Sequence, residues 1–184
     1  VLSHFSYTFE KGFIYGITAP SGTGKTTLLN LIGNILKPAQ GEIETDFKTG
    51  IAYVFQEPEL LSQLTIAENI ALPLAAYLKK EIAFEQAISI LQKMELDGFE
   101  NRFPNELSFG QQQRAAIARA LTYPSPLLLM DEPFKGLDEA LSRRIIKRIR
   151  ERQTENGQTI LFTSHNPGEL RLFADKTVRL RSEE

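Results

Sequence analysis

Near its start, the chain places a glycine-rich turn between a strand-like apolar run and a helical pattern, an order that few folds accommodate. Residues 13–18 have the length and apolarity of a buried strand, residues 19–26 read APSGTGKT, and apolar positions within residues 28–32 recur at helical spacing. In such a unit, successive backbone N–H groups and the helix N-terminus form a concave site for an anion. The pattern predicts a phosphate-binding loop, with a glycine-rich turn that binds nothing as the alternative.

Individual side chains of this turn suit that chemistry. Lys25 can reach the outer phosphates of a nucleotide, and the Thr26 hydroxyl can ligate Mg²⁺. Gly22 and Gly24 allow close approach of the backbone, because they carry no Cβ. The full pattern begins with glycine, where this chain has Ala19; a methyl group fits there if φ is negative. The predicted phosphate-binding residues are Ala19, Pro20, Ser21, Gly22, Thr23, Gly24, Lys25, Thr26 and Thr27.

Elsewhere, apolar runs of strand length alternate with helical patterns, which predicts an α/β fold with a mainly parallel sheet flanked by helices. The further strand candidates are residues 51–55, 126–130, 159–163 and 177–180. No strand-like run occurs between residues 58 and 107. There, Thr65 and Glu68 have capping-box spacing, and apolar positions in residues 81–94 recur at helical intervals. We expect one domain over residues 1–184, with a core of about 1–57 and 115–184 and an inserted helical subdomain of about 58–114.

Composition excludes several classes of protein. Apolar residues make up 42% and charged residues 24%, as in a globular protein, and 21 basic against 23 acidic side chains argue against a dedicated nucleic-acid binder. The absence of cysteine excludes disulfides and thiolate metal sites. The longest apolar run, residues 70–78, contains a proline and is far shorter than the roughly 20 residues of a membrane span. We expect no signal peptide, and because residue 1 is not methionine, a fragment is one interpretation.

A second candidate site follows the apolar run 126–130. Asp131 and Glu132 come at the carboxyl end of this predicted strand, where open α/β sheets bind ligands, and Pro133 ends the strand. Asp131 can hold Mg²⁺ directly or through water, and Glu132 can act as a general base toward a water molecule. Alone, such a pair is more often the exposed start of a loop, so this interpretation depends on the phosphate-binding loop.

Taken together, the motifs resemble those of the ATP-binding cassette family, the nucleotide-binding domains of ABC transporters. The landmarks, in the order of the family, are residues 19–26, Gln56 within residues 54–58, residues 107–111 (LSFGQ), residues 130–133 (MDEP) and His165 within residues 163–165. Residues 136–138 stand where the family has its D-loop. Residues 56–61 and 131–134 are similar to importer ATPases of the nitrate, sulfonate and taurine group.

This resemblance implies a head-to-tail dimer that encloses two ATP molecules. The phosphate-binding loop of one subunit would face Ser108, Gly110 and Gln111 of the other, and Asp138 would act across the interface. The implied catalytic residues are Glu132, His165 and Gln56; the implied metal ligands are Thr26, Gln56 and Asp131. The implied nucleotide-binding set adds Gln56, Asp131, Ser108, Gly110 and Gln111 to the phosphate-binding loop. Taken singly, Gln56 could be a turn residue, His165 a hydrogen-bonded histidine and Ser108 a helix cap.

Two departures from the family pattern stand out. Phe109 replaces the first glycine of the signature segment and is expected to add bulk beside the partner's nucleotide, so restoring glycine is expected to raise dimer-dependent hydrolysis. The aromatic residue that stacks on adenine usually precedes the loop by twenty-odd residues, whereas only 18 residues precede Ala19 here, so its strand is expected to be missing. Phe5, Tyr7 and Phe9 alternate and are predicted to form one face of a strand.

Residues 143–152 carry the densest positive charge of the chain. Apolar residues at 137, 141, 145 and 149 recur every four residues, which predicts a helix whose apolar stripe packs on the sheet while the charges face water. Subunit contacts and an anionic membrane surface are the alternatives.

The motifs predict an ATP-binding and ATP-hydrolysing subunit that powers a membrane ABC transporter, an importer, with ATP and Mg²⁺ as cofactors. Its expected partners are transmembrane permease subunits, a second ATPase subunit, identical or different, and a solute-binding protein, with no nucleic acid. Its expected location is peripheral, on the cytoplasmic side of the cell membrane. The alternatives are a soluble ABC ATPase of DNA repair or translation, and a regulatory nucleotide-binding module with little hydrolysis, suggested by Ala19 and Phe109.

Overall fold

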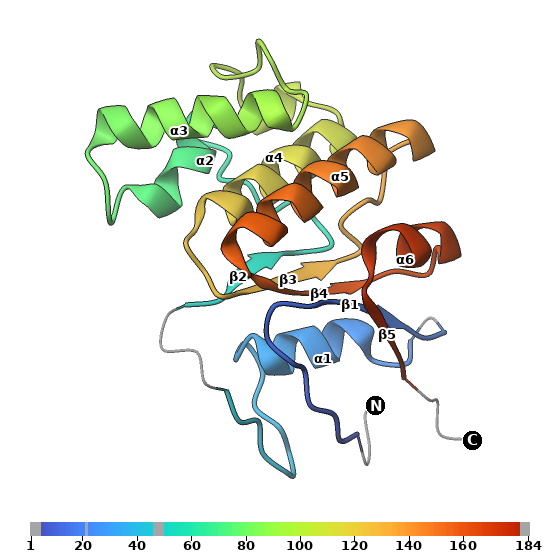
Figure 1. Ribbon diagram of the computed structural model, residues 1–184. Helices are drawn as coiled ribbons and strands as arrows, with labels where there is room; N and C mark the ends of the chain where they lie inside the picture. Colours follow the sequence, from blue (N-terminus) through green and yellow to red (C-terminus); the bar gives the residue numbers. More distant parts are fainter. Residues whose placement is uncertain (1–4, 21, 46–49, 181–184) are drawn as a thin grey trace.

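A five-stranded parallel sheet forms the centre of the computed structural model, which describes residues 5–20, 22–45 and 50–180 (Figure 1). The strands are β1 (Ile14–Thr18), β2 (Ala52–Val54), β3 (Leu127–Asp131), β4 (Thr159–Thr163) and β5 (Lys176–Arg179). Their order in the sheet is β2-β3-β4-β1-β5, and every neighbouring pair is parallel. Since the carboxyl ends of parallel strands share one edge, the loops that follow β1, β2, β3 and β4 are brought together.

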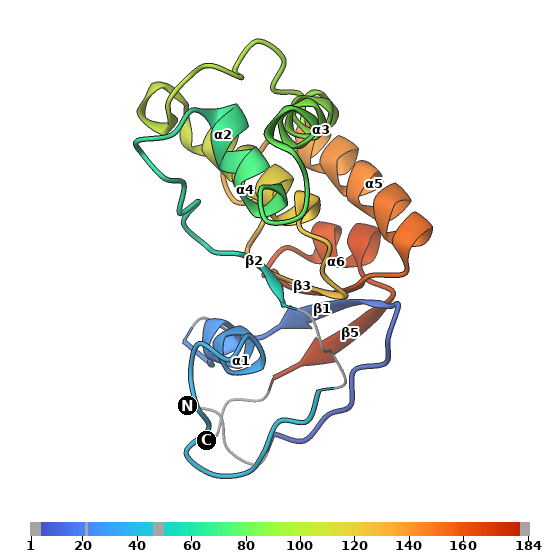
Figure 2. The same cartoon turned by 90° about the vertical axis from the view of Figure 1, so that its left-hand side faces the viewer.

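Helices cover both faces of this sheet (Figures 1 and 2). One face is covered by α1 (Lys25–Ile32), and the other by α4 (Phe109–Thr122), α5 (Glu139–Asn156) and α6 (Pro167–Phe173). Beyond α4 lie α2 (Ile66–Ala71) and α3 (Lys80–Lys93), and two short 3-10 helices, η1 (Leu72–Leu74) and η2 (Pro104–Glu106), complete the fold. The α/β prediction is confirmed, and the strands predicted over residues 13–18, 51–55, 126–130, 159–163 and 177–180 are found with shifts of at most one residue at their ends.

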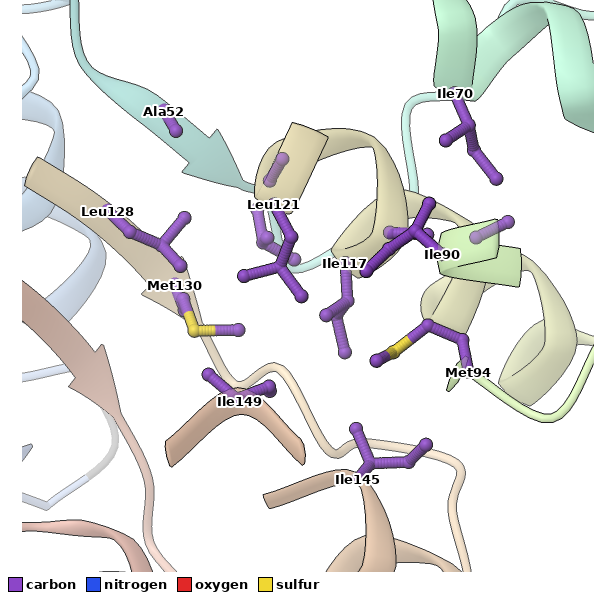
Figure 3. Close-up of a cluster of buried hydrophobic side chains, with 14 of the residues drawn as sticks. Ala52, Ile70, Ile90, Met94, Ile117, Leu121, Leu128, Met130, Ile145 and Ile149 are labelled. Atoms are coloured by element: carbon purple, nitrogen blue, oxygen red, sulfur yellow. The ribbon is translucent and has the colours of Figure 1, made fainter. Parts of the chain in front are cut away.

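The larger apolar cluster runs without a break from the sheet to the outer helices (Figure 3). It includes Leu128 and Met130 on β3, Ile145 and Ile149 on α5, Ile117 and Leu121 on α4, Ile90 on α3 and Ile70 on α2. A smaller cluster on the opposite face packs β1 and β3 against α1. The helices between β2 and β3 therefore share one core with the sheet instead of forming a core of their own.

Two local predictions about helices are confirmed. Thr65 and Glu68 form a capping box at the start of α2, with N···O distances of 2.8 and 3.3 Å. On α5, Ile145 and Ile149 are fully buried. Most positive side chains of α5 make ion pairs with acidic neighbours, including Arg144 with Glu95 and Arg150 with Asp175, both at 2.8 Å. This pairing favours the predicted helix face over a surface for anions. Within the described residues, no helix combines the length and the apolarity needed to cross a membrane.

The strand predicted over Phe5, Tyr7 and Phe9 is wrong. Residues 5–10 have no strand structure; instead, the rings of Tyr7 and Phe9 lie 4.7 Å apart and pack edge-on against Tyr15 of β1, at 6.1 and 5.0 Å. The backbone N–H of Glu10 donates to the Tyr15 hydroxyl at 2.8 Å. Alternating aromatic residues can thus be accommodated by stacking around one side chain, without a neighbouring strand.

Candidate functional site

The turn between β1 and α1 has the backbone that an anion-binding loop requires. Gly22 and Gly24 have φ of 78° and 96°, a left-handed conformation that glycine adopts readily. Ala19 is not among the residues with positive φ, so its methyl group is accommodated as expected. Gly24 caps α1 without a side-chain hydrogen bond, which leaves the first N–H groups of the helix as donors for an anion. Ser21 lies outside the described residues.

Lys25 is folded back over this loop. Its Nζ atom donates to the carbonyl oxygens of Ala19 at 3.0 Å and of Pro20 at 3.3 Å. The same loop is closed by a long backbone hydrogen bond of 3.4 Å from Thr23 N–H to Pro20 O. The ammonium group is therefore held at the loop by two neutral acceptors. A phosphate oxygen could take their place and would form a stronger, charge-assisted hydrogen bond with Lys25.

Asp131 connects the loop to the end of β3. Its carboxylate accepts hydrogen bonds from Thr26 Oγ1 at 2.6 Å and from Thr163 Oγ1 at 2.5 Å, and only 2% of the residue is exposed. A buried carboxylate is costly unless both oxygens have partners, and here each oxygen has one. The two threonines therefore fix the position of Asp131 between α1 and β4.

Glu132 is held in an uncommon backbone conformation beside this carboxylate. Its φ is 46°, a region that non-glycine residues rarely adopt and that is often found at functional sites. The Glu132 N–H donates to Thr163 Oγ1 at 2.9 Å, and its Oε1 lies 3.3 Å from Nδ1 of His165. The Glu132 side chain is 22% exposed and that of His165 is 75% exposed. Both can therefore meet a ligand from solvent while the backbone beneath Glu132 is fixed.

The segment that carries His165 is itself braced. Ser164 Oγ donates to Glu169 Oε2 at 2.5 Å and accepts from Asn166 N–H at 2.9 Å. Asn166 caps α6 by accepting from Gly168 N–H at 2.8 Å. These bonds hold the loop on either side of His165 and leave its ring exposed.

The oxygen atoms at this edge of the sheet fit Mg²⁺. Thr26 and Asp131 offer a hydroxyl and a carboxylate 2.6 Å apart, next to the proposed phosphate position. In the part of the chain that the structure describes, no group of three or more His, Cys, Asp or Glu residues could hold a metal by itself. Mg²⁺ commonly takes one or two protein oxygens together with substrate phosphates and water, so this donor set suits that ion.

Gln56 and the segment around Ser108 lie on other elements. Gln56 is exposed and follows β2, whose Val54 pairs with Met130, so it stands at the same sheet edge as Asp131. Ser108 caps α4 in a capping box with Gln111: Gln111 N–H donates to Ser108 Oγ at 3.4 Å, and Ser108 N–H to Gln111 Oε1 at 2.8 Å. Among the described residues, no hydrogen bond joins Ser108, Gly110 or Gln111 to residues 19–27.

Thr163 of the site and a neighbouring residue, Tyr53, were not singled out in the sequence. Thr163 was placed in a strand and in the segment around His165 but was given no role of its own, although the β3–β4 register places it directly beside Asp131. Tyr53 of β2 donates its hydroxyl hydrogen to Asn30 Oδ1 of α1 at 2.9 Å. Burial and, to a smaller extent, the charge of Asp131 raise the pKa of Tyr53. The sequence signal that could have pointed to Thr163 is a polar residue at the carboxyl end of an otherwise apolar strand.

Comparisons with known proteins agree with this geometry. A family model described as ABC transporter matches residues 2–135. The thiamine import ATP-binding proteins ThiQ of Shigella flexneri serotype 5b and Escherichia coli O157:H7 are 38% identical over 184 residues, 95% of this chain and 79% of theirs. A dimeric structure of a post-hydrolysis state of the ATP-binding cassette MJ0796 bound to ADP and Pi superimposes with a TM-score of 0.88 at 34% identity, over 95% of this chain and 84% of that one.

Proposed function

The chain belongs to the ABC transporter family and is an ATPase that powers a transporter, and on this basis we propose which of its residues bind and hydrolyse ATP. The family resemblance and the predicted ATPase activity are confirmed, and the relatives are importer ATPases, in broad agreement with the expected importer group. Members of this family work with a second ATPase subunit and with membrane permease subunits. The non-transport alternatives are disfavoured by relatives that act in import.

ATP would bind through residues 19–27. The phosphates would accept hydrogen bonds from the first N–H groups of α1, and Lys25 would exchange its contacts with Ala19 and Pro20 for the outer phosphate oxygens. Thr26, Asp131 and Gln56 would hold Mg²⁺, Asp131 directly or through water. When bound, this ion neutralises phosphate charge in the transition state. The support for this arrangement is the uncapped N-terminus of α1 and the oxygen pair of Thr26 and Asp131.

Glu132 would act as the general base. As a water oxygen attacks the γ-phosphorus and the bond to the bridging oxygen of ADP breaks, the proton of the water would pass to the Glu132 carboxylate. With a proton on each ring nitrogen, His165 would donate from Nδ1 to Glu132 Oε1 and from Nε2 to a γ-phosphate oxygen. Gln56 would orient the water. The single observation that carries this proposal is the Glu132 backbone, fixed at φ 46° by Thr163.

Each site would be completed by Ser108, Gly110 and Gln111 of a second cassette. The capping box uses the side-chain oxygen atoms of Ser108 and Gln111 as acceptors. Their hydroxyl and amide hydrogens would therefore be the donors to a phosphate. The helix dipole of α4 adds positive potential at the same end. Asp138, whose carboxylate caps α5 through Leu141 N–H at 2.8 Å, would stand at the interface.

We further propose that the transporter is an importer and that this subunit lies peripherally at the cytoplasmic face of the membrane, bound to permease subunits that receive cargo from a solute-binding protein. Residues of about 58–114 would form the helical subdomain that transmits the motion of the ATPase. The apolar cluster continuous from β3 through α4 to α2 supports this role, because a displacement of the sheet edge would move the outer helices with it.

Mixing two inactive variants tests the shared site. Lys25→Ala removes the phosphate contact, and Ser108→Asp keeps a good helix cap while its charge repels the phosphate. Each variant alone should be inactive, whereas co-expressed chains should regain about one quarter of the wild-type rate, since half of the dimers would contain one intact site. Ser108→Asn, an uncharged cap, is the matched control and should retain activity. If the mixture stays inactive, or if Ser108→Asp hydrolyses ATP as fast as Ser108→Asn, the shared site is wrong.

A further inference from the structure

Phe109, the residue in place of the signature glycine, packs against the turn that follows Glu132 in its own chain. A Cβ at Gly136 would lie 2.7 Å from Cδ1 of the Phe109 ring, closer than side chains tolerate. A Cβ at Gly110 would lie 2.6 Å from the carbonyl oxygen of Gly136. The first turn of α4 and the turn over residues 132–138 therefore approach at a separation that only paired glycines allow.

Lys135 extends this contact to a third segment. Its Nζ lies 5.4 Å from the centroid of the Phe109 ring, within the range of a cation–π interaction, and 3.3 Å from Oε1 of Glu57. Glu57 directly follows Gln56. The Phe109 ring thus lies where the start of α4, the turn after Glu132 and the segment after β2 come together. The ion pair with Glu57 is exposed and weak by itself, so the ring packing on Gly136 is the main contact.

The turn between Glu132 and Gly136 is short and hydrogen-bonded. Lys135 N–H donates to Glu132 O, and Leu137 N–H to Phe134 O, both at 3.1 Å, and Phe134 is buried in the core. A shift of Lys135 or Gly136 would therefore reach Glu132 through a few rigid peptide units. Lys25 and Thr26 lie on α1, which this contact does not involve.

We propose that Phe109 is a positioning residue for ATP hydrolysis: its ring, seated on Gly136 beneath Lys135, holds the turn that carries Glu132 and the N-terminus of α4 as one unit. This inference rests on the proposed roles of Glu132 and of the segment around Ser108. From the sequence alone, glycine at position 109 is expected to raise hydrolysis. The contact with Gly136 predicts the opposite, because removing the ring frees the turn and α4 to move apart.

Steady-state kinetics of Phe109→Gly, with Phe109→Leu and Phe109→Tyr beside it, test this role. Phe109→Gly should lower kcat about tenfold or more, since small misplacements of catalytic groups are costly, while KM and ATP binding measured separately change less than about twofold. Phe109→Tyr keeps the ring and should retain most of the wild-type kcat. The kcat of Phe109→Leu should lie between those of the tyrosine and glycine variants. Lys135→Met should lower kcat slightly in the wild type and not at all in the Phe109→Gly background.

A kcat for Phe109→Gly equal to or above that of the wild type would overturn the inference. If the glycine variant does not fold, the inference is tested by the other two variants. It requires a higher kcat for Phe109→Tyr than for Phe109→Leu, and equal kcat values for these two would overturn it. Glu132→Gln separates this inference from the proposed function: turnover lost in Glu132→Gln but intact in Phe109→Gly contradicts only the role of Phe109. Turnover intact in Glu132→Gln contradicts the proposed base itself.

Discussion

Thr163 Oγ1 donates to Asp131 Oδ1 across 2.5 Å, joining the ends of two neighbouring parallel strands, β4 and β3. The same oxygen accepts the N–H of Glu132. One buried hydroxyl thus holds both the carboxylate proposed for Mg²⁺ and the backbone of the proposed general base. The family motifs end at His165 and do not identify this threonine as part of the site.

Thr163→Val keeps the shape of the side chain and removes its hydroxyl. Asp131 would lose a donor and Glu132 N–H an acceptor in a buried place, which we expect to cost about 1–3 kcal/mol of stability. Because Glu132 would no longer be fixed, kcat should fall about 10- to 100-fold. Thr163→Ser restores the hydroxyl and is the matched control. Equal kcat for the valine and serine variants, measured at saturating ATP, would show that the hydroxyl does not position Glu132.

Ile117→Ala tests whether the helical layer and the sheet share one core. Ile117 is fully buried on α4 within the cluster that reaches from β3 to α3 (Figure 3). The truncation should lower the free energy of unfolding by about 2–5 kcal/mol. Ile82→Ala on α3, where the side chain is exposed, should change it by less than about 0.5 kcal/mol. Denaturant unfolding followed by circular dichroism measures both, and a separate early transition confined to the helical layer in the wild type would contradict a shared core.

Glu95 gives a pH-dependent contribution to stability. Its hydrogen bond with Arg144, aided by the charges of Arg148 and Arg114, lowers the pKa of Glu95 against the opposing effect of partial burial. A lowered folded-state pKa stabilises the fold above the unfolded value of about 4.3, and the contribution is lost as pH falls through the folded-state pKa. Glu95→Gln should therefore lower Tm at pH 7, with a difference from the wild type that persists down to about pH 4.3 and shrinks as the pH falls further. A difference that is constant with pH would contradict this origin.

The sequence predicts the fold well where a local pattern decides the structure. Strand-length apolar runs alternating with helices leave little choice but a parallel sheet. The Thr65–Glu68 spacing forms the expected capping box, and Ser108 caps a helix as its residue type predicts. The strand prediction for residues 5–10 is wrong because an alternation of aromatic residues does not distinguish a strand from rings packed around Tyr15.

The sequence predicts the motif residues of the candidate site, but it does not predict the residues that hold them in position. Thr163 acts through the register of β3 and β4, and the contact of Phe109 with Gly136 joins segments far apart in the sequence. No local pattern contains either relationship, since both depend on how the elements pack. The comparison with a glycine signature placed Phe109 beside a partner's nucleotide, whereas its ring contacts Gly136 of its own chain.

In the proposed mechanism, Glu132 takes the proton from the attacking water. Glu132→Gln keeps the size of the side chain and one acceptor oxygen, and it removes the basic carboxylate. Phosphate release by the variant, measured together with ATP binding and with the lifetime of the ATP-bound dimer, tests this most directly. We expect retained ATP binding, abolished turnover and a longer-lived dimer; turnover equal to that of the wild type would exclude Glu132 as the base.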